Sequence, residues 1–229
     1  MEKISSYNSS ANVKMSKTWF LVVAGFATEV VALVGFLTIN GASGIPTAAT
    51  VGTSGLVAVG LLLPAAGMLQ LRKGFDPTQR AVRKGLTLQG FGLIGLFFGV
   101  VLTGVISSLA SYLVSAAFVA ASSALGLAGA VLLRRHYINT GAPNAKTVKY
   151  LILGMALVFS GVGMIVGSNI AFQYLISQVE NTVYVDIGAT VSACGFVLAA
   201  LSFDRIGMHI AHVGCQSPNM MNRLSERRN

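Results

Sequence analysis

Charged residues are scarce in this chain of 229 residues. Only 10% of its positions are Asp, Glu, Lys or Arg, whereas soluble domains carry about 25%. Apolar residues make up 54% of the chain and gather in long runs. This composition excludes an ordinary soluble domain and predicts an integral membrane protein.

Cysteine and histidine are nearly absent, and their positions argue against a metal or haem site. Cys194 lies in an apolar run and Cys215 in a polar tail, while His136, His209 and His212 lie outside the apolar runs. No Cys-x-x-Cys pair and no Cys/His cluster with the spacing of a zinc, iron–sulfur or c-type haem site occurs. A haem-b protein would need axial ligands within its helices. We therefore expect neither a cofactor nor a metal.

Motifs of common enzymes are also missing. The sequence contains no Gly-x-Ser-x-Gly elbow, no His-Glu-x-x-His, no Walker loop with its lysine and no paired carboxylates. Its net charge of +9 arises from 16 Lys and Arg against 7 Asp and Glu, but the cations lie in short loops and tails between apolar runs. We expect no enzymatic activity and no nucleic-acid partner.

Six apolar runs account for most of the chain. The first, residues 18–40, reaches about 34 Å as a helix, which is enough to cross about 30 Å of hydrocarbon. We predict an all-α polytopic membrane protein, a compact bundle of six transmembrane helices with short loops. The expected spans cover about residues 18–40, 50–71, 86–109, 112–133, 150–175 and 183–203.

Two tails flank the predicted transmembrane domain of residues 18–203. Residues 1–17 are polar and are expected to form a short flexible cytoplasmic tail. Residues 204–229 form a basic cytoplasmic tail, and its stretch FDRIGMHIAHVG predicts an interfacial helix. The alternative is metal binding by His209 and His212, for which a His-x-x-His spacing is weak evidence.

Several residues within the runs predict local helix geometry. Pro64 should kink the second span, and Ala110 and Ser111 leave room only for a tight reversal between the third and fourth spans. Those two spans should therefore form a hairpin. Two Gly-x-x-x-Gly pairs favour close helix packing. They are Gly95 with Gly99 in the third span and Gly163 with Gly167 in the fifth.

The distribution of basic residues predicts the orientation of the spans. All 16 Lys and Arg residues lie in the two tails and in the loops 72–85 and 134–149, whereas the alternate loops have none. By the positive-inside rule both termini should be cytoplasmic, next to an anionic leaflet. Basic exits recur after every second span, which is consistent with three tandem hairpins, although the topology alone also produces this spacing.

One carboxylate, Glu29, interrupts the first span near its middle. An ionised group at the bilayer midplane is costly, so Glu29 must be paired, protonated, hydrated or functional. Counting about 1.5 Å per residue places further polar side chains at the same depth. They are Ser122, Ser123, Ser160 and Cys194, and with Glu29 they could form one polar layer that carries protons or a small cation. The alternative is that a protonated Glu29 only joins two helices.

A second polar group is expected near the outer leaflet. Asn169 and Gln173 are four residues apart on the fifth span and therefore share a helix face. They could form the mouth of a pathway or hydrogen bonds between helices, and the sequence favours the structural role.

Two functional hypotheses remain open. The first is a small transporter that moves protons or a small solute by way of Glu29. The second is a non-catalytic structural or assembly subunit of a larger membrane complex, such as a secretion or respiratory assembly. The expected partners are the lipid bilayer and either further copies of the chain or other membrane subunits. The short loops and the charge distribution favour a bacterial or archaeal plasma membrane.

Overall fold

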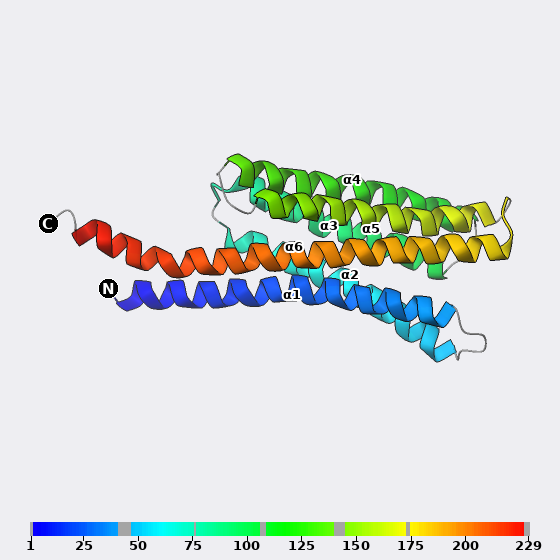
Figure 1. Ribbon diagram of the computed structural model, residues 1–229, viewed down its shortest axis with the longest axis horizontal. Helices are drawn as coiled ribbons and strands as arrows, with labels where there is room; N and C mark the ends of the chain where they lie inside the picture. The colour runs from blue at the N-terminus through cyan, green and yellow to red at the C-terminus, as the bar shows by residue number, and fades with distance from the viewer. Residues whose placement is uncertain are drawn as a thin grey trace.

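Six long helices follow one another along the chain (Figure 1). The computed structural model describes residues 2–40, 47–75, 77–105, 109–139, 145–172 and 175–226. Its helices are α1 (Glu2–Asn40), α2 (Thr47–Gly74), α3 (Arg80–Val105), α4 (Leu109–Asn139), α5 (Ala145–Phe172) and α6 (Gln178–Glu226).

Each helix contains a stretch that is long and apolar enough to cross a bilayer. These stretches are Lys17–Ile39, Gly55–Gly74, Arg80–Leu102, Leu109–Asn139, Thr147–Phe172 and Gln178–Gly207. Large apolar side chains also cover the outside of the helices: Phe20 is 71% exposed and Val31 64%. Such a surface is stable against lipid rather than water. The chain is therefore an integral membrane protein, and the predicted all-α bundle of six spans is confirmed.

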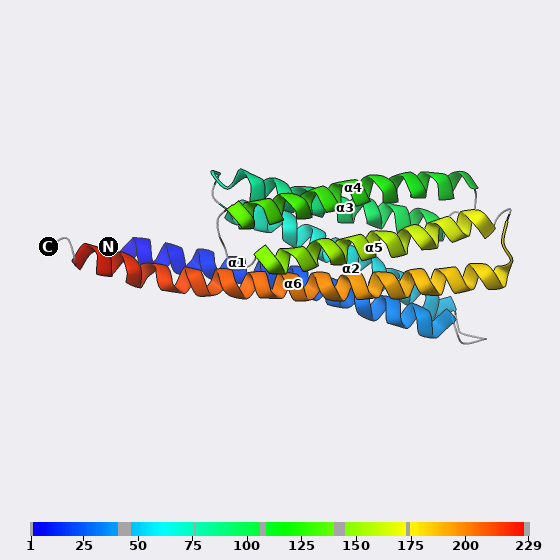
Figure 2. The same cartoon turned by 45° about the horizontal axis from the view of Figure 1, so that its top comes forward.

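The six helices form a closed ring. Each helix packs against its neighbours in the sequence, and α1 packs against α6. Successive helices run in opposite directions, so both termini lie at the same end of the bundle (Figures 1 and 2). We call this end the basic end, because α2 finishes there with Arg72 and Lys73 and α4 with Arg134 and Arg135.

Aromatic side chains close the ring between its first and last helices. The ring centroids of Trp19 in α1 and Phe203 in α6 are 5.3 Å apart. Phe26, which is fully buried, lies 5.8 Å from Phe196 and 5.9 Å from Phe203. These distances are typical of favourable aromatic pairs. The contact between α1 and α6 is therefore a packed part of the core.

Glycines spaced by seven residues produce the closest contact between α5 and α6. Gly154 lies against Gly195, and Gly161 lies against Gly188. A Cβ atom on any of the four would come within 2.8 Å of the backbone oxygen of the opposite glycine. Seven residues are about two helical turns, so both glycines of each helix share one face. Only hydrogen fits at these positions.

The hairpin of α3 and α4 repeats this spacing with serines on one side. Gly85, Gly92 and Gly99 of α3 follow one another at intervals of seven and lie against α4. The backbone oxygens opposite them belong to Gly129, Ser122 and Ser115. The hydroxyl of Ser115 also donates a hydrogen bond of 2.5 Å to the carbonyl of Gly99. The hairpin predicted for the third and fourth spans is therefore present.

The helices extend beyond the predicted spans at several places. α1 begins at Glu2, so residues 2–17, expected as a tail, are helical and continue the first span. α6 likewise runs to Glu226 without a break, so the stretch predicted as an interfacial helix belongs to the same helix as the sixth span. Figure 1 shows α1 and α6 extending past the other four helices at the basic end.

Local hydrogen bonds explain why α6 begins before the predicted sixth span. α6 begins at Gln178, earlier than the predicted residue 183, because Ser177 and Glu180 form a capping box. The backbone N–H of Ser177 donates to Oε2 of Glu180 at 2.8 Å, and the N–H of Glu180 donates to the Ser177 hydroxyl at 3.3 Å.

Ala110 and Ser111, predicted to form a reversal, lie in the first turn of α4.

Candidate functional site

The candidate site is centred on Glu29 of α1, near the middle of the first span. Its side chain is only 2% exposed. It lies against Gly60 of α2, where an added Cβ would overlap with Oε2 of Glu29 and would come within 2.9 Å of its Cα and backbone nitrogen. The absence of a side chain at Gly60 therefore makes room for the carboxyl group.

A second close contact lies one turn away and fixes the same crossing of α1 and α2. A Cβ on Gly25 of α1 would come within 2.8 Å of the backbone nitrogen of Pro64 and within 3.0 Å of Cβ of Leu63. Gly25 precedes Glu29 by four residues, and Pro64 follows Gly60 by four residues. The two pairs therefore stack along the helix axes, and the backbones approach closely over one full turn.

Pro64 changes the hydrogen bonding of the turn that Glu29 contacts. Proline has no backbone N–H, so it cannot donate the bond that the carbonyl of Gly60 would receive within α2. Pro64 is buried inside the helix, and α2 continues on both sides of it. The carboxyl group of Glu29 is thus packed beside a turn in which the carbonyl of Gly60 lacks its usual helical donor.

Among the residues that the structure describes, five side chains have buried polar atoms without a hydrogen-bond partner: Trp19, Glu29, Gln89, Asn181 and Asp186. In Glu29 the atom is Oε2, and in Gln89 of α3 both the amide oxygen and the nitrogen lack a partner. Gln89 lies against Gly129 of α4, in a different helix interface from Glu29. An unpaired polar group in an apolar interior is costly, so each marks a place where a proton, an ion or water would be stabilised.

The residues predicted to form one polar layer lie on separate surfaces. The hydroxyls of Ser122 and Ser123 donate to the carbonyls of Phe118 and Val119 in their own helix, at 2.5 and 2.7 Å. Ser122 is buried against α3, whereas α1 packs against α2 and α6. Ser160 and Cys194 are exposed on the outside of α5 and α6. The structure therefore does not gather these four residues around Glu29.

Of the outer polar pair, Asn169 and Gln173, only Asn169 lies among the residues that the structure describes. Asn169 is partly buried, and its Oδ1 accepts a hydrogen bond of 3.3 Å from Nδ2 of Asn181 in α6. This bond joins α5 to α6, the structural role that the sequence favoured. Gln173 lies outside the described residues.

The two predicted Gly-x-x-x-Gly pairs face different surroundings. Gly95 lies against the hydroxyl of Ser122, and Gly99 lies against Val119 of α4, so this pair takes part in the α3–α4 contact. Gly163 and Gly167 are exposed, and nothing lies within 4 Å of a Cβ added to either. The second pair therefore forms an exposed strip without side chains on the outside of α5.

Sequence reasoning missed the partner of Glu29, although signals for it exist. Gly60 precedes Pro64 by four residues in the second span, and Gly25 precedes Glu29 by four residues in the first. In an antiparallel hairpin these two pairs lie at the same height, so a small residue opposite the carboxylate can be anticipated.

No metal-binding group is formed by the part of the chain that the structure describes, since no three His, Cys, Asp or Glu side chains meet there. Comparison of the sequence with protein-family models and with curated proteins, and of the structure with solved structures, finds no match. The geometry around Glu29 is therefore the basis for the function considered next.

Proposed function

We propose that the chain is a small membrane transporter, rather than an enzyme, and that Glu29 binds and releases a proton or a small cation during transport. The observation that carries this proposal is the carboxyl group itself. It is 2% exposed, lies near the middle of a span, and has an Oε2 atom without a hydrogen-bond partner among the described residues. Buried ionisable groups at this depth typically belong to ion or proton pathways.

The chemistry beside Glu29 suits a proton or a small cation. A carboxylate and a backbone carbonyl released by proline are both oxygen acceptors, and such pairs coordinate protons and Na⁺ in transporters with interrupted helices. Gly60 supplies the carbonyl and Pro64 removes its helical donor. The proposed binding site therefore consists of Glu29 and the turn from Gly60 to Pro64.

The surroundings of Glu29 favour release as well as binding. The segments of α2 and α6 at this height, residues 55–71 and 187–203, contain no acidic or basic residue that would neutralise a carboxylate. A protonated or cation-bound Glu29 is stable there, whereas a bare carboxylate needs water. Loss of the proton or cation would therefore favour a second arrangement of α1 and α2 that admits water.

Replacing Glu29 by glutamine tests the proposal, because the amide keeps the shape and loses the titratable group. Purified protein in vesicles should move protons down a pH gradient, or a small cation down a gradient of that cation. Glu29→Gln should lower the flux by about tenfold or more. Glu180→Gln, the same change at an exposed glutamate, should leave the flux unchanged.

Two results would contradict transport through Glu29. One is an unaltered flux in folded Glu29→Gln protein, and the other is the absence of any proton or cation flux with the unmodified chain. Orientation is tested separately in inside-out membrane vesicles prepared from cells, because the basic end is proposed to face the cytoplasm. External protease should cleave a carboxyl-terminal tag in these vesicles and not in intact cells.

The outward strip on α5 favours a second function, that of a non-catalytic subunit in a membrane assembly. Gly163 and Gly167 form a Gly-x-x-x-Gly pair that none of the described helices α1–α6 covers. Ser160 lies exposed one turn before Gly163. Such strips allow another transmembrane helix to approach closely.

Mass measurement of the protein extracted in mild detergent tests this second function. A complex with further subunits, lost when Gly163 and Gly167 are both changed to leucine, would support it. A monomer whose mass is the same before and after the double substitution would contradict it. The substitution Leu153→Val, at an exposed position on the same helix, is the matched control.

A further inference from the structure

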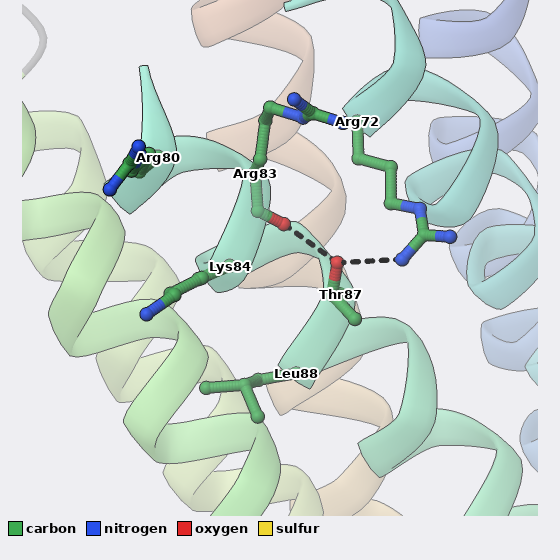
Figure 3. Close-up of a pocket in the computed structure, with 6 residues that line it drawn as sticks. All are labelled: Arg72, Arg80, Arg83, Lys84, Thr87 and Leu88. Atoms are coloured by element: carbon green, nitrogen blue, oxygen red, sulfur yellow. Dashed lines mark hydrogen bonds between the residues drawn. The ribbon is translucent and has the colours of Figure 1, made fainter. Parts of the chain in front are cut away.

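A second candidate binding site lies far from Glu29, at the basic end. Arg72 at the end of α2 and three cations in the first turns of α3, Arg80, Arg83 and Lys84, line a pocket of about 340 Å³ (Figure 3). Thr87 and Leu88 complete its lining. Its volume falls within the range of small-ligand sites, about 300–1,000 Å³.

The charge around this pocket is of one sign. Its lining residues include three arginines and one lysine, and no carboxylate lines it among the residues that the structure describes. Cations that line one pocket repel one another, and a bound anion lowers this repulsion. The pocket therefore has the electrostatic character of an anion site.

Hydrogen bonds hold one of the cations in place. Nη1 of Arg72 donates to the hydroxyl of Thr87 at 3.2 Å, and this hydroxyl donates to the carbonyl of Arg83 at 2.7 Å (Figure 3). The guanidinium of Arg72, from α2, is thereby fixed against the second turn of α3. A guanidinium held in a defined orientation loses less entropy when it binds an anion.

The position of the pocket matches the depth of lipid headgroups. The apolar stretch of α2 ends at Gly74 and that of α3 begins at Arg80, so the pocket lies where these two spans leave the hydrocarbon. The amino end of the 26-residue helix α3 adds the positive pole of its dipole. Both features favour a phosphate group, which arginine binds through two parallel hydrogen bonds.

We propose that this pocket binds a phosphate group, supplied by the headgroup of an anionic phospholipid or by a soluble phosphate compound. Arg72 and Arg83 contact the phosphate from two different helices, and Arg80 and Lys84 lie at the pocket rim. Occupation of the site joins the ends of α2 and α3. The proposal is independent of transport through Glu29, because the two sites lie at different depths of the bundle.

Binding to the full-length protein tests the proposal. Native mass spectrometry of the detergent-extracted protein counts how many molecules of each added lipid stay bound. The lipids are phosphatidylglycerol, cardiolipin and, as the zwitterionic control, phosphatidylcholine. A separate titration uses inorganic phosphate and pyrophosphate. The variant Arg72→Gln with Arg83→Gln should weaken binding of the phosphate-bearing ligand by about tenfold or more. Arg134→Gln with Arg135→Gln removes the same charge from exposed positions at the same end and should change it less than twofold.

The arms of the experiment separate the two sources of phosphate. Selective loss of phosphatidylglycerol or cardiolipin assigns the site to lipid, and loss of pyrophosphate or phosphate binding assigns it to a soluble ligand. Equal binding by both double variants, or no binding of any anionic ligand by the unmodified protein, would overturn the proposal. If the Arg72 variant does not fold, Arg80→Gln with Lys84→Gln replaces it, because both side chains are exposed and belong to the same pocket.

Discussion

Gly161→Leu is expected to prevent α5 and α6 from packing. A Cβ at Gly161 would come within 2.7 Å of the backbone nitrogen of Ser192 and would overlap with the carbonyl oxygen of Gly188. Because the obstructing atoms belong to the backbone, the whole helix must move, and the remaining side-chain atoms of leucine add to the overlap. Overpacking of this kind costs about 3 kcal/mol or more. For a chain of this size that lowers Tm by about 6–12 °C, measurable as loss of a monodisperse peak on heating.

The same substitution two residues away is the control. Gly163 lies on the outside of α5, where nothing lies within 4 Å of an added Cβ. Gly163→Leu should leave Tm within about 2 °C of the unmodified protein, because surface substitutions usually change stability by less than about 0.5 kcal/mol. Equal loss of stability in both variants would show that α5 does not meet α6 through the face that contains Gly154 and Gly161.

Phe26→Ala is expected to open the contact between the first and last helices. The ring of Phe26 is fully buried between Phe196 and Phe203. Removing it leaves a void, and phenylalanine-to-alanine changes in cores cost about 3–5 kcal/mol. Much of that cost is lost van der Waals contact, which persists inside a membrane where burial from water does not contribute. We expect a lower Tm and faster proteolysis near the ends of α1 and α6.

Phe20→Ala separates the loss of this contact from a general loss of hydrophobic surface. Phe20 lies on the same helix and is 71% exposed. Its removal should alter Tm by no more than about 2 °C, since no protein void is created. A ring that is not closed by α1 and α6 in the membrane would instead give the two phenylalanine variants similar stabilities.

The number and type of the elements could be predicted because lipid imposes a strong rule. A span must satisfy every backbone hydrogen bond within itself, so an apolar run of about 20 residues becomes a helix. The runs around Glu29, Pro64 and Gly95 therefore indicated their helices correctly. The ends of the helices were harder, because the capping box of Ser177 and Glu180 lies among polar residues where the apolar signal has ended.

The direction in which each side chain points could not be predicted from periodicity. In a soluble helix the apolar face is the buried face, but lipid and protein interior are equally apolar. Ser160 and Cys194 were placed at a suitable depth, yet their helices turn them outward. For the same reason Gly163 and Gly167 were assigned to helix packing, whereas the close contact is made by Gly161, two residues before Gly163 and in no Gly-x-x-x-Gly pair.

The position of Glu29 within a span could be predicted, whereas the spacing of Gly25 and Pro64 only indicates which residue of α2 it meets. A lone carboxylate in an apolar run is visible in any sequence. Its contact with Gly60 depends on the register of α1 against α2, which no single span encodes. That register follows from the fit of Gly25 to Pro64 one turn away, and such a fit between two helices exists only after they have met.

Closure of the ring has a consequence for the order of events during synthesis. Phe26 is made about 170 residues before its partner Phe196. At roughly 5–20 residues per second, the ribosome needs about 10–30 s to cover that interval. Each hairpin can assemble while the next is being made, because its two helices are neighbours in the chain. The face of α1 that carries Trp19 and Phe26 must wait for the last helix, so a chain that stops before Phe196 keeps an open ring however well its hairpins have formed.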